Sequence, residues 1–133
     1  MERVKFVVRY TNGKVIKGFT QNFFPNKERF HLFPVDNPSG KLIEVFVKEL
    51  KAVFLVRDFV GNSEYNERKR YVAGENPSGR KLEVSFADGE VMIGSTRGYG
   101  QHRPGFFIFP ADPKSNNISV FVVSSAVKNV REL

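Results

Sequence analysis

The residues of this sequence that could carry acid–base or nucleophilic chemistry are few and scattered. There are two histidines and no cysteine. His31 stands in an apolar segment between Phe30 and Leu32, and His102 stands beside Arg103 in a polar segment. A nucleophilic site needs a base within reach of its nucleophile, and a metal site needs three or four ligands. No such set is recognisable here, so we predict that the protein is not an enzyme and holds no metal and no cofactor.

The segment from Arg97 to Gly105 is better suited to binding than to catalysis. It contains three glycines and one proline, which set the shape of a loop. Tyrosine and arginine are favoured anchors of interfaces, because they combine a large contact area with a hydrogen-bonding end. We predict that the binding residues of this loop are Arg97, Tyr99, His102 and Arg103.

The elements that must position this loop follow from an internal repeat. Three segments recur in the same order about 76 residues later: Tyr10–Gly18 as Phe86–Gly94, Phe30–Asp36 as Phe106–Asp112, and Val45–Val47 as Val120–Val122. Matches in a constant order indicate two copies of one supersecondary unit. We therefore divide the chain into a first repeat (1–58), a charged linker (59–78) and a second repeat (79–133).

Each repeat has the pattern of five short β-strands. The predicted strands are 4–10, 15–19, 29–33, 42–47 and 52–56, then 82–86, 91–96, 106–109, 118–123 and 127–131. Asn12-Gly13 and Asp88-Gly89 are strong hairpin signals. A short 3₁₀ turn is expected before the last strand of each repeat. The sequence thus predicts an all-β protein of tandem five-stranded small barrels from a duplication, packed about a pseudo-twofold axis or sharing an edge strand.

The first repeat offers weaker counterparts of the candidate loop. Phe23 matches Tyr99 in position, and Arg29 follows in the same connection. We add Phe23 and Arg29 to the predicted binding residues. The alternative interpretation is that both aromatic rings cover the end of a barrel.

The segment from Val8 to Phe19 resembles the first sequence motif of Sm proteins, with apolar residues, a turn glycine and a second glycine on the next strand. This resemblance implies SH3-like or Sm-like small barrels. In Sm proteins that bind RNA, an Asp and an Asn lie around the second-to-third strand loop. Here Asn22 and Asn26 lack that spacing. The typical nucleotide pocket is therefore not expected.

The second half also resembles an uncharacterised bacterial domain family. The resemblance rests on Gly98-Tyr99, on Arg103–Pro113, on Ser115–Asn117 and on Phe121–Lys128. That family is associated with signalling-rich bacteria and has no established activity. The resemblance implies a bacterial regulatory context and no reaction.

Composition leaves several partners open. The net charge of +7 is concentrated in the first half, which suits an acidic protein or nucleic acid. We predict a binding or adaptor module for a protein partner, with oligomers possible through exposed strand edges. The alternative is RNA or single-stranded nucleic acid bound by a basic aromatic surface, whose first-copy residues would be Phe23, Phe24, Lys27 and Arg29.

A weaker alternative is cyclic-dinucleotide binding. PilZ barrels use paired arginines and an Asp/Asn-x-Ser-x-x-Gly segment, and this chain offers Arg68-Lys69-Arg70 and Asn76-Pro77-Ser78-Gly79 at different spacings. The absence of cysteine and of any long apolar run predicts a cytoplasmic protein that does not enter membranes.

Overall fold

The computed structural model describes residues 4–36, 40–61, 65, 67–72, 74, 75, 77, 79–99 and 103–133. Their regular structure consists of ten β-strands and two short 3₁₀ turns. The elements are β1 (Lys5–Tyr10), β2 (Val15–Phe19), β3 (Arg29–Pro34), β4 (Ile43–Phe46), η1 (Val47–Glu49), β5 (Leu50–Val56), β6 (Arg80–Phe86), β7 (Val91–Thr96), β8 (Gly105–Pro110), β9 (Asn117–Val123), η2 (Ser124–Ala126) and β10 (Val127–Glu132). Each predicted strand is present, and the all-β class is confirmed.

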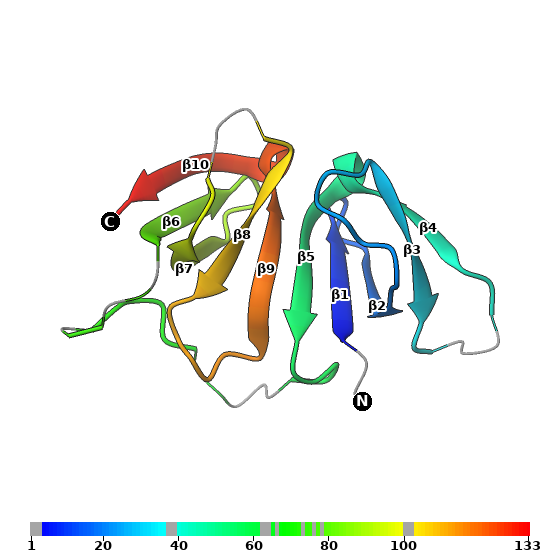
Figure 1. Ribbon diagram of the computed structural model, residues 1–133, viewed down its shortest axis with the longest axis horizontal. Coiled ribbons are helices and arrows are strands. Elements are labelled where there is room, and N and C mark those ends of the chain that lie inside the picture. Colours follow the sequence, from blue (N-terminus) through cyan, green and yellow to red (C-terminus); the bar gives the residue numbers. More distant parts are fainter. Residues whose placement is uncertain are drawn as a thin grey trace.

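The ten strands form one antiparallel sheet in the order β10-β6-β7-β8-β9-β5-β1-β2-β3-β4. The sheet is not closed, because β10 and β4 each have one strand neighbour in the described part of the chain. Figure 1 shows two strongly curved halves, with β9 and β5 side by side in the middle. The halves therefore meet edge to edge.

Strand pairing follows the same register in both halves. β5 places Val53 opposite Val8 on β1, and β10 places Val130 opposite Val84 on β6. Both pairings also have an irregularity near the first residue of the last strand.

The register corrects the third of the sequence matches. Val45 lies opposite Phe30, whereas Val122 lies opposite Phe106, its counterpart in the other half. The counterpart of Val45 is therefore Val122, and the predicted match to Val120 is wrong by two residues. A slip of two keeps every side chain on its own face, so an apolar pattern alone does not detect it.

Two hydrophobic cores lie on opposite faces of the central β9–β5 pair. Successive side chains of a strand point to opposite faces. On β9, Phe121 and Val123 enter the core of the first half, while Val120 enters the core of the second. On β5, Val53 enters the first core and Phe54 the second. Each half thus completes its core with side chains from the other.

Glycines shape the hairpins and the closest strand contact. Gly13 and Gly89 have φ values of 94° and 97°, as expected for the predicted turns. At Gly94 on β7, an added Cβ would lie 2.3 Å from the backbone oxygen of Phe109 on β8. The backbones of these two strands therefore approach so closely that glycine is required.

In the part of the chain that the structure describes, no helix is long and apolar enough to span a membrane.

Candidate binding site

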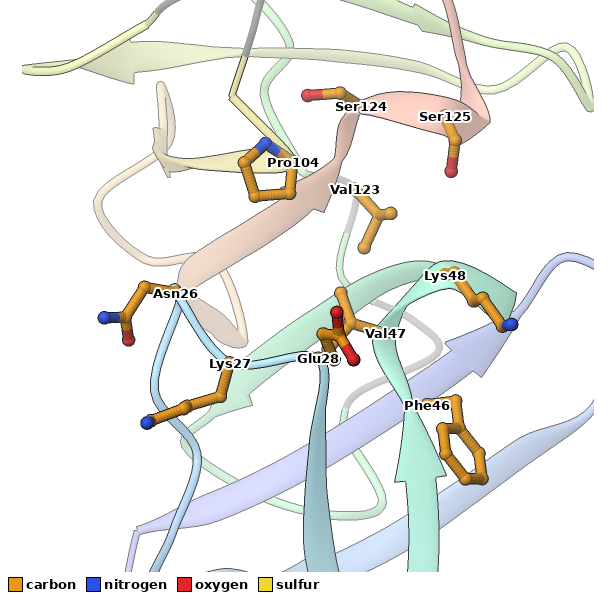
Figure 2. Close-up of a pocket in the computed structure, with 10 residues that line it drawn as sticks. All are labelled: Asn26, Lys27, Glu28, Phe46, Val47, Lys48, Pro104, Val123, Ser124 and Ser125. Carbon is orange, nitrogen blue, oxygen red and sulfur yellow. The ribbon is translucent and has the colours of Figure 1, made fainter.

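A groove of about 490 Å³ lies where the two halves meet. We call it the junction groove. Figure 2 shows its lining, with residues of the second half on one side and residues of the first half on the other. The lining residues are Asn26, Lys27, Glu28, Phe46, Val47, Lys48, Pro104, Val123, Ser124 and Ser125.

The groove exists because β9 pairs with β5. This pairing brings together η1 and η2, which follow β4 and β9 in the chain. Each turn is anchored to the preceding long loop of its own half by an equivalent hydrogen bond. The N–H of Val47 donates to the carbonyl of Glu28 (2.9 Å), and the N–H of Ser124 donates to that of Pro104 (2.9 Å). The walls of the groove are thus held by backbone bonds.

The floor of the groove is apolar and part of its rim is basic. Val47 and Val123 are buried, and Phe46 is half-buried. Lys27, Lys48 and Glu28 are exposed, giving two cations and one carboxylate around the opening. The arrangement can accept an apolar side chain and attract a nearby acidic group. Among the described residues, no histidine lines the groove.

Of the described residues in the predicted loop of the second half, one near its end borders the groove. Pro104 lines the groove. Tyr99 is half-buried and packs edge-to-face on Phe106, with ring centroids 4.8 Å apart. The guanidinium of Arg80 lies 5.9 Å from the centroid of the Tyr99 ring. Tyr99 therefore packs against the second core rather than projecting from the loop.

The other predicted residues of this loop lie on the surface. Arg97 and Arg103 are exposed, and Arg103 donates a long hydrogen bond of 3.4 Å to the carbonyl of Gly98. His102 lies outside the described residues. Both arginines remain available for contacts, while the described geometry does not gather them around a pocket.

Phe23, the counterpart of Tyr99, is also a core-covering residue. Its ring lies 5.0 Å from that of Phe30 and 5.5 Å from that of Phe121. Arg29 is exposed and forms an ion pair with Glu44 at 3.2 Å. Of the predicted binding residues in the first half, one is thus packed and the other is paired.

His31 is held by its neighbours in the sheet. Its backbone N–H donates to Oδ1 of Asn22 (2.9 Å), and its Nδ1 lies 3.1 Å from Nδ2 of the same residue. Its Nε2 lies 3.7 Å from a carboxylate oxygen of Glu44. Among the described residues, no three His, Asp or Glu side chains gather to form a metal site.

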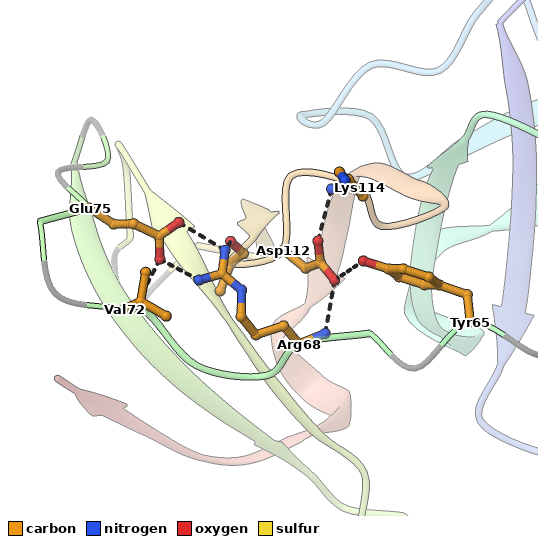
Figure 3. A network of polar contacts seen from close by, with 7 residues as sticks. Tyr65, Arg68, Val72, Glu75, Asp112 and Lys114 are labelled. Atoms are coloured by element: carbon orange, nitrogen blue, oxygen red, sulfur yellow. Dashed lines mark hydrogen bonds and ion pairs between the residues drawn. The ribbon is translucent and has the colours of Figure 1, made fainter.

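The charged linker contains a polar network that the sequence did not indicate. Asp112 follows β8 and is 5% exposed. Its carboxylate accepts hydrogen bonds from the backbone N–H groups of Arg68 and Lys114, both at 2.9 Å, and from the Tyr65 hydroxyl (Figure 3). The Tyr65 hydroxyl and these N–H groups hold the pKa of Asp112 below its ordinary value. A buried carboxylate of the second half therefore fixes the linker.

Arg68 is the second anchor of the linker. Its guanidinium donates to both carboxylate oxygens of Glu75, at 2.6 and 2.8 Å (Figure 3). This bidentate bond, with the Val72 N–H, lowers the pKa of Glu75 to about 2. Because its fork is engaged, Arg68 is a poor candidate for the cyclic-dinucleotide arginine, although Lys69 and Arg70 are exposed.

Lys51 of β5 joins the two halves by charge. It is 8% exposed, and its Nζ lies 2.7 Å from Oδ2 of Asp88 and also contacts the carboxylate of Glu90. The ammonium lies 4.8 Å from the centroid of the Phe86 ring. The Lys51 ammonium and the Glu90 N–H lower the pKa of Asp88. The sequence held a signal for this contact, since the first hairpin has Asn12 and Lys14 where the second has these acids.

A family model described as a family of unknown function (DUF6982) matches residues 2–133. The chain belongs to this family. The expected membership of an uncharacterised domain family is thereby confirmed, without any assigned activity. No curated protein and no solved structure matches the chain.

The junction groove was missed by sequence reasoning because its walls come from strands more than 60 residues apart. Neither repeat contains it alone.

Proposed function

We propose that this member of DUF6982 is a non-catalytic binding module that holds a segment of a protein partner in the junction groove. The observation that carries the proposal is the groove itself, about 490 Å³ and apolar at its floor. Its volume is within the range of about 300–1,000 Å³ that is typical of sites for small molecules and side chains. The groove is also bounded by turns on rigid strands, which is how binding surfaces are usually presented.

The chemistry of the groove favours a partner segment with an aromatic or aliphatic side chain beside an acidic one. The apolar side chain would cover Val47 and Val123, which form the floor. The acid would meet the exposed ammonium groups of Lys27 and Lys48 on the rim. Rim charges contribute to association rate and specificity more than to affinity.

Binding to single-stranded nucleic acid is the second candidate, and one observation favours it. Phe24 is 52% exposed, close in sequence to Lys27 and Arg29, which are exposed as well. An exposed ring between cations can stack on a base while the cations meet phosphates. Such binding would weaken steeply with added salt, because counterions are released from the nucleic acid.

We also propose that the two halves arose by duplication of one small SH3-like or Sm-like barrel. The matching strand order and register of the halves support this origin. A bacterial regulatory setting and a cytoplasmic location remain proposals, which rest on the sequence resemblance and on the lack of cysteine.

The test begins with selection of peptides from a random display library on the full-length protein. The selected peptides are then labelled and titrated by fluorescence polarisation. Ser125→Trp places a bulky ring at the groove from an exposed position and should weaken binding at least about tenfold. Lys48→Glu should weaken acidic peptides severalfold, and the matched control Lys41→Glu, also at an exposed lysine, should leave affinity unchanged.

Two results would contradict the proposal. One is that the Ser125→Trp variant binds every selected peptide with the same affinity as the wild type. The other is that a labelled single-stranded oligonucleotide binds more tightly than any peptide and that Phe24→Ala abolishes this binding. That result would establish the nucleic-acid alternative.

A further inference from the structure

A second pocket lies at the outer edge of the second half, and Ser124 lines both this pocket and the junction groove. It has a volume of about 300 Å³ and lies beside β10, the last strand of the sheet. Tyr99, Phe106, Val127 and Val130 contribute its apolar lining. We call it the edge pocket. Among the described residues, β10 pairs with β6 and has no strand on its other side.

The first half shows what can pair with the outer side of the last strand of a half. There β5 has the position that β10 has in the second half, and β9 pairs with it. Phe121 of β9 lies opposite Val53, and its ring packs 5.5 Å from the ring of Phe23. Phe121 is 1% exposed. A strand carrying an aromatic side chain therefore fills this place completely.

The same surroundings recur at the edge pocket without the strand. Val130 is the counterpart of Val53, because Val130 lies opposite Val84 as Val53 lies opposite Val8. Tyr99 packs on Phe106 as Phe23 packs on Phe30. By register, the edge pocket corresponds to the place of Phe121, and no aromatic side chain from a paired strand fills it in the described part of the chain.

A second copy of this chain is a poor occupant. The exposed edge strand of such a copy would be β4, the counterpart of β9. Glu44 of β4 lies opposite His31, and Phe121 of β9 lies opposite Phe107. Glu44 therefore has the position of Phe121. A second copy would therefore bring a carboxylate, and no aromatic ring, to Tyr99 and Phe106. Within the molecule, Glu90 of the second hairpin meets Lys51. In a dimer the equivalent contact would bring Lys14 of the first hairpin toward Lys128, which places two like charges together.

We propose that β10 accepts an extended segment of a different protein as an eleventh, antiparallel strand, with an aromatic side chain in the edge pocket and an acidic residue beside Lys128. Lys128 is exposed, and none of the ion pairs among the described residues involves it. Lys51, its counterpart, binds two carboxylates. Strand addition obtains affinity from backbone hydrogen bonds and specificity from pockets for alternate side chains.

The probe is a labelled peptide built on residues 115–124. It keeps phenylalanine at the position of Phe121 and carries glutamate at those of Val120 and Val122, which would lie opposite Arg131 and Asn129. We expect saturable one-to-one binding to the full chain, with amide NMR shifts concentrated on β10. Replacing the phenylalanine of the peptide by serine should weaken binding at least about tenfold, and N-methylation of its backbone on the pairing side should abolish it.

Protein variants complete the test and separate it from the junction groove. Lys128→Glu should weaken binding of the peptide severalfold, whereas Lys41→Glu and Lys48→Glu should leave its affinity unchanged, because neither lysine lines the edge pocket. Equal affinity for the serine peptide, or shifts confined to η1 and residues 26–28, would overturn the proposal. Sedimentation should show a monomer, and a dimer that is dispersed by an excess of the peptide would instead make a second copy the occupant.

Discussion

The shared cores predict an energetic coupling between the two halves that can be measured at Phe121. Its ring belongs to the second half but lies in the core of the first, 5.5 Å from Phe23 and 5.2 Å from Phe107. Phe121→Leu keeps most of the apolar volume and removes both edge-to-face ring contacts. Each such contact contributes about 0.5–1.5 kcal/mol beyond burial, so the expected loss in free energy of unfolding is about 1–3 kcal/mol. Urea unfolding gives this value.

The decisive experiment is a double-mutant cycle across the two halves. Phe121→Leu combined with Phe23→Leu should show an interaction energy of at least about 0.5 kcal/mol, because the two rings touch. The matched control pairs Phe121→Leu with Tyr99→Leu, since Tyr99 is the counterpart of Phe23 but packs on the other core. That pair should be additive. Additivity in the Phe23 cycle, or equal coupling in both cycles, would refute the reasoning.

Two further predictions concern the linker and the sheet. The pKa of Glu75 is about 2 when folded and 4.5 ordinarily, so its stabilising contribution is complete above pH 4.5 and is lost as the pH falls toward 2. Melting at pH 6, 4 and 2.5 should therefore show that Glu75→Gln is less stable than the wild type at pH 6 and loses less on acidification; identical pH profiles would contradict this. In Gly94→Ala, the new Cβ would lie 2.3 Å from the backbone oxygen of Phe109, and urea unfolding should show a loss of about 1–3 kcal/mol. At Gly98, which has no positive φ, the nearest described atom to a new Cβ is the end of the flexible Arg103 side chain at 3.2 Å. Gly98→Ala should therefore cost less, and the reverse order would disprove the steric explanation.

The sequence predicted the local structure well because local signals determine it. Asn12-Gly13 and Asp88-Gly89 specify their turns through positive φ at glycine, and segments rich in apolar and β-branched residues mark the strands. The repeat also indicated that the two halves share one strand order. These features depend on neighbours in the chain.

The candidate site was harder to predict because it depends on which strands pair at a distance. Tyr99 and Phe23 have the residue type of interface anchors, yet both pack against cores. Nothing local marked Val47 and Val123 as two sides of one groove. Asp112 likewise reads as a turn residue, and its role in holding the linker depends on Tyr65 and Arg68 reaching it across more than 40 residues.

The central position of β5 also has a consequence for synthesis of the chain on the ribosome. β5 is buried almost entirely on both faces, and the strand that covers its outer edge, β9, begins about 60 residues after β5 ends. At about 5–20 residues per second, this strand waits roughly 3–12 s for its partner. An apolar, unpaired edge is a site for aggregation during that time. Lys51 and Arg57 place a charge at either end of Ala52–Val56, and flanking charges of this kind oppose aggregation of an apolar strand.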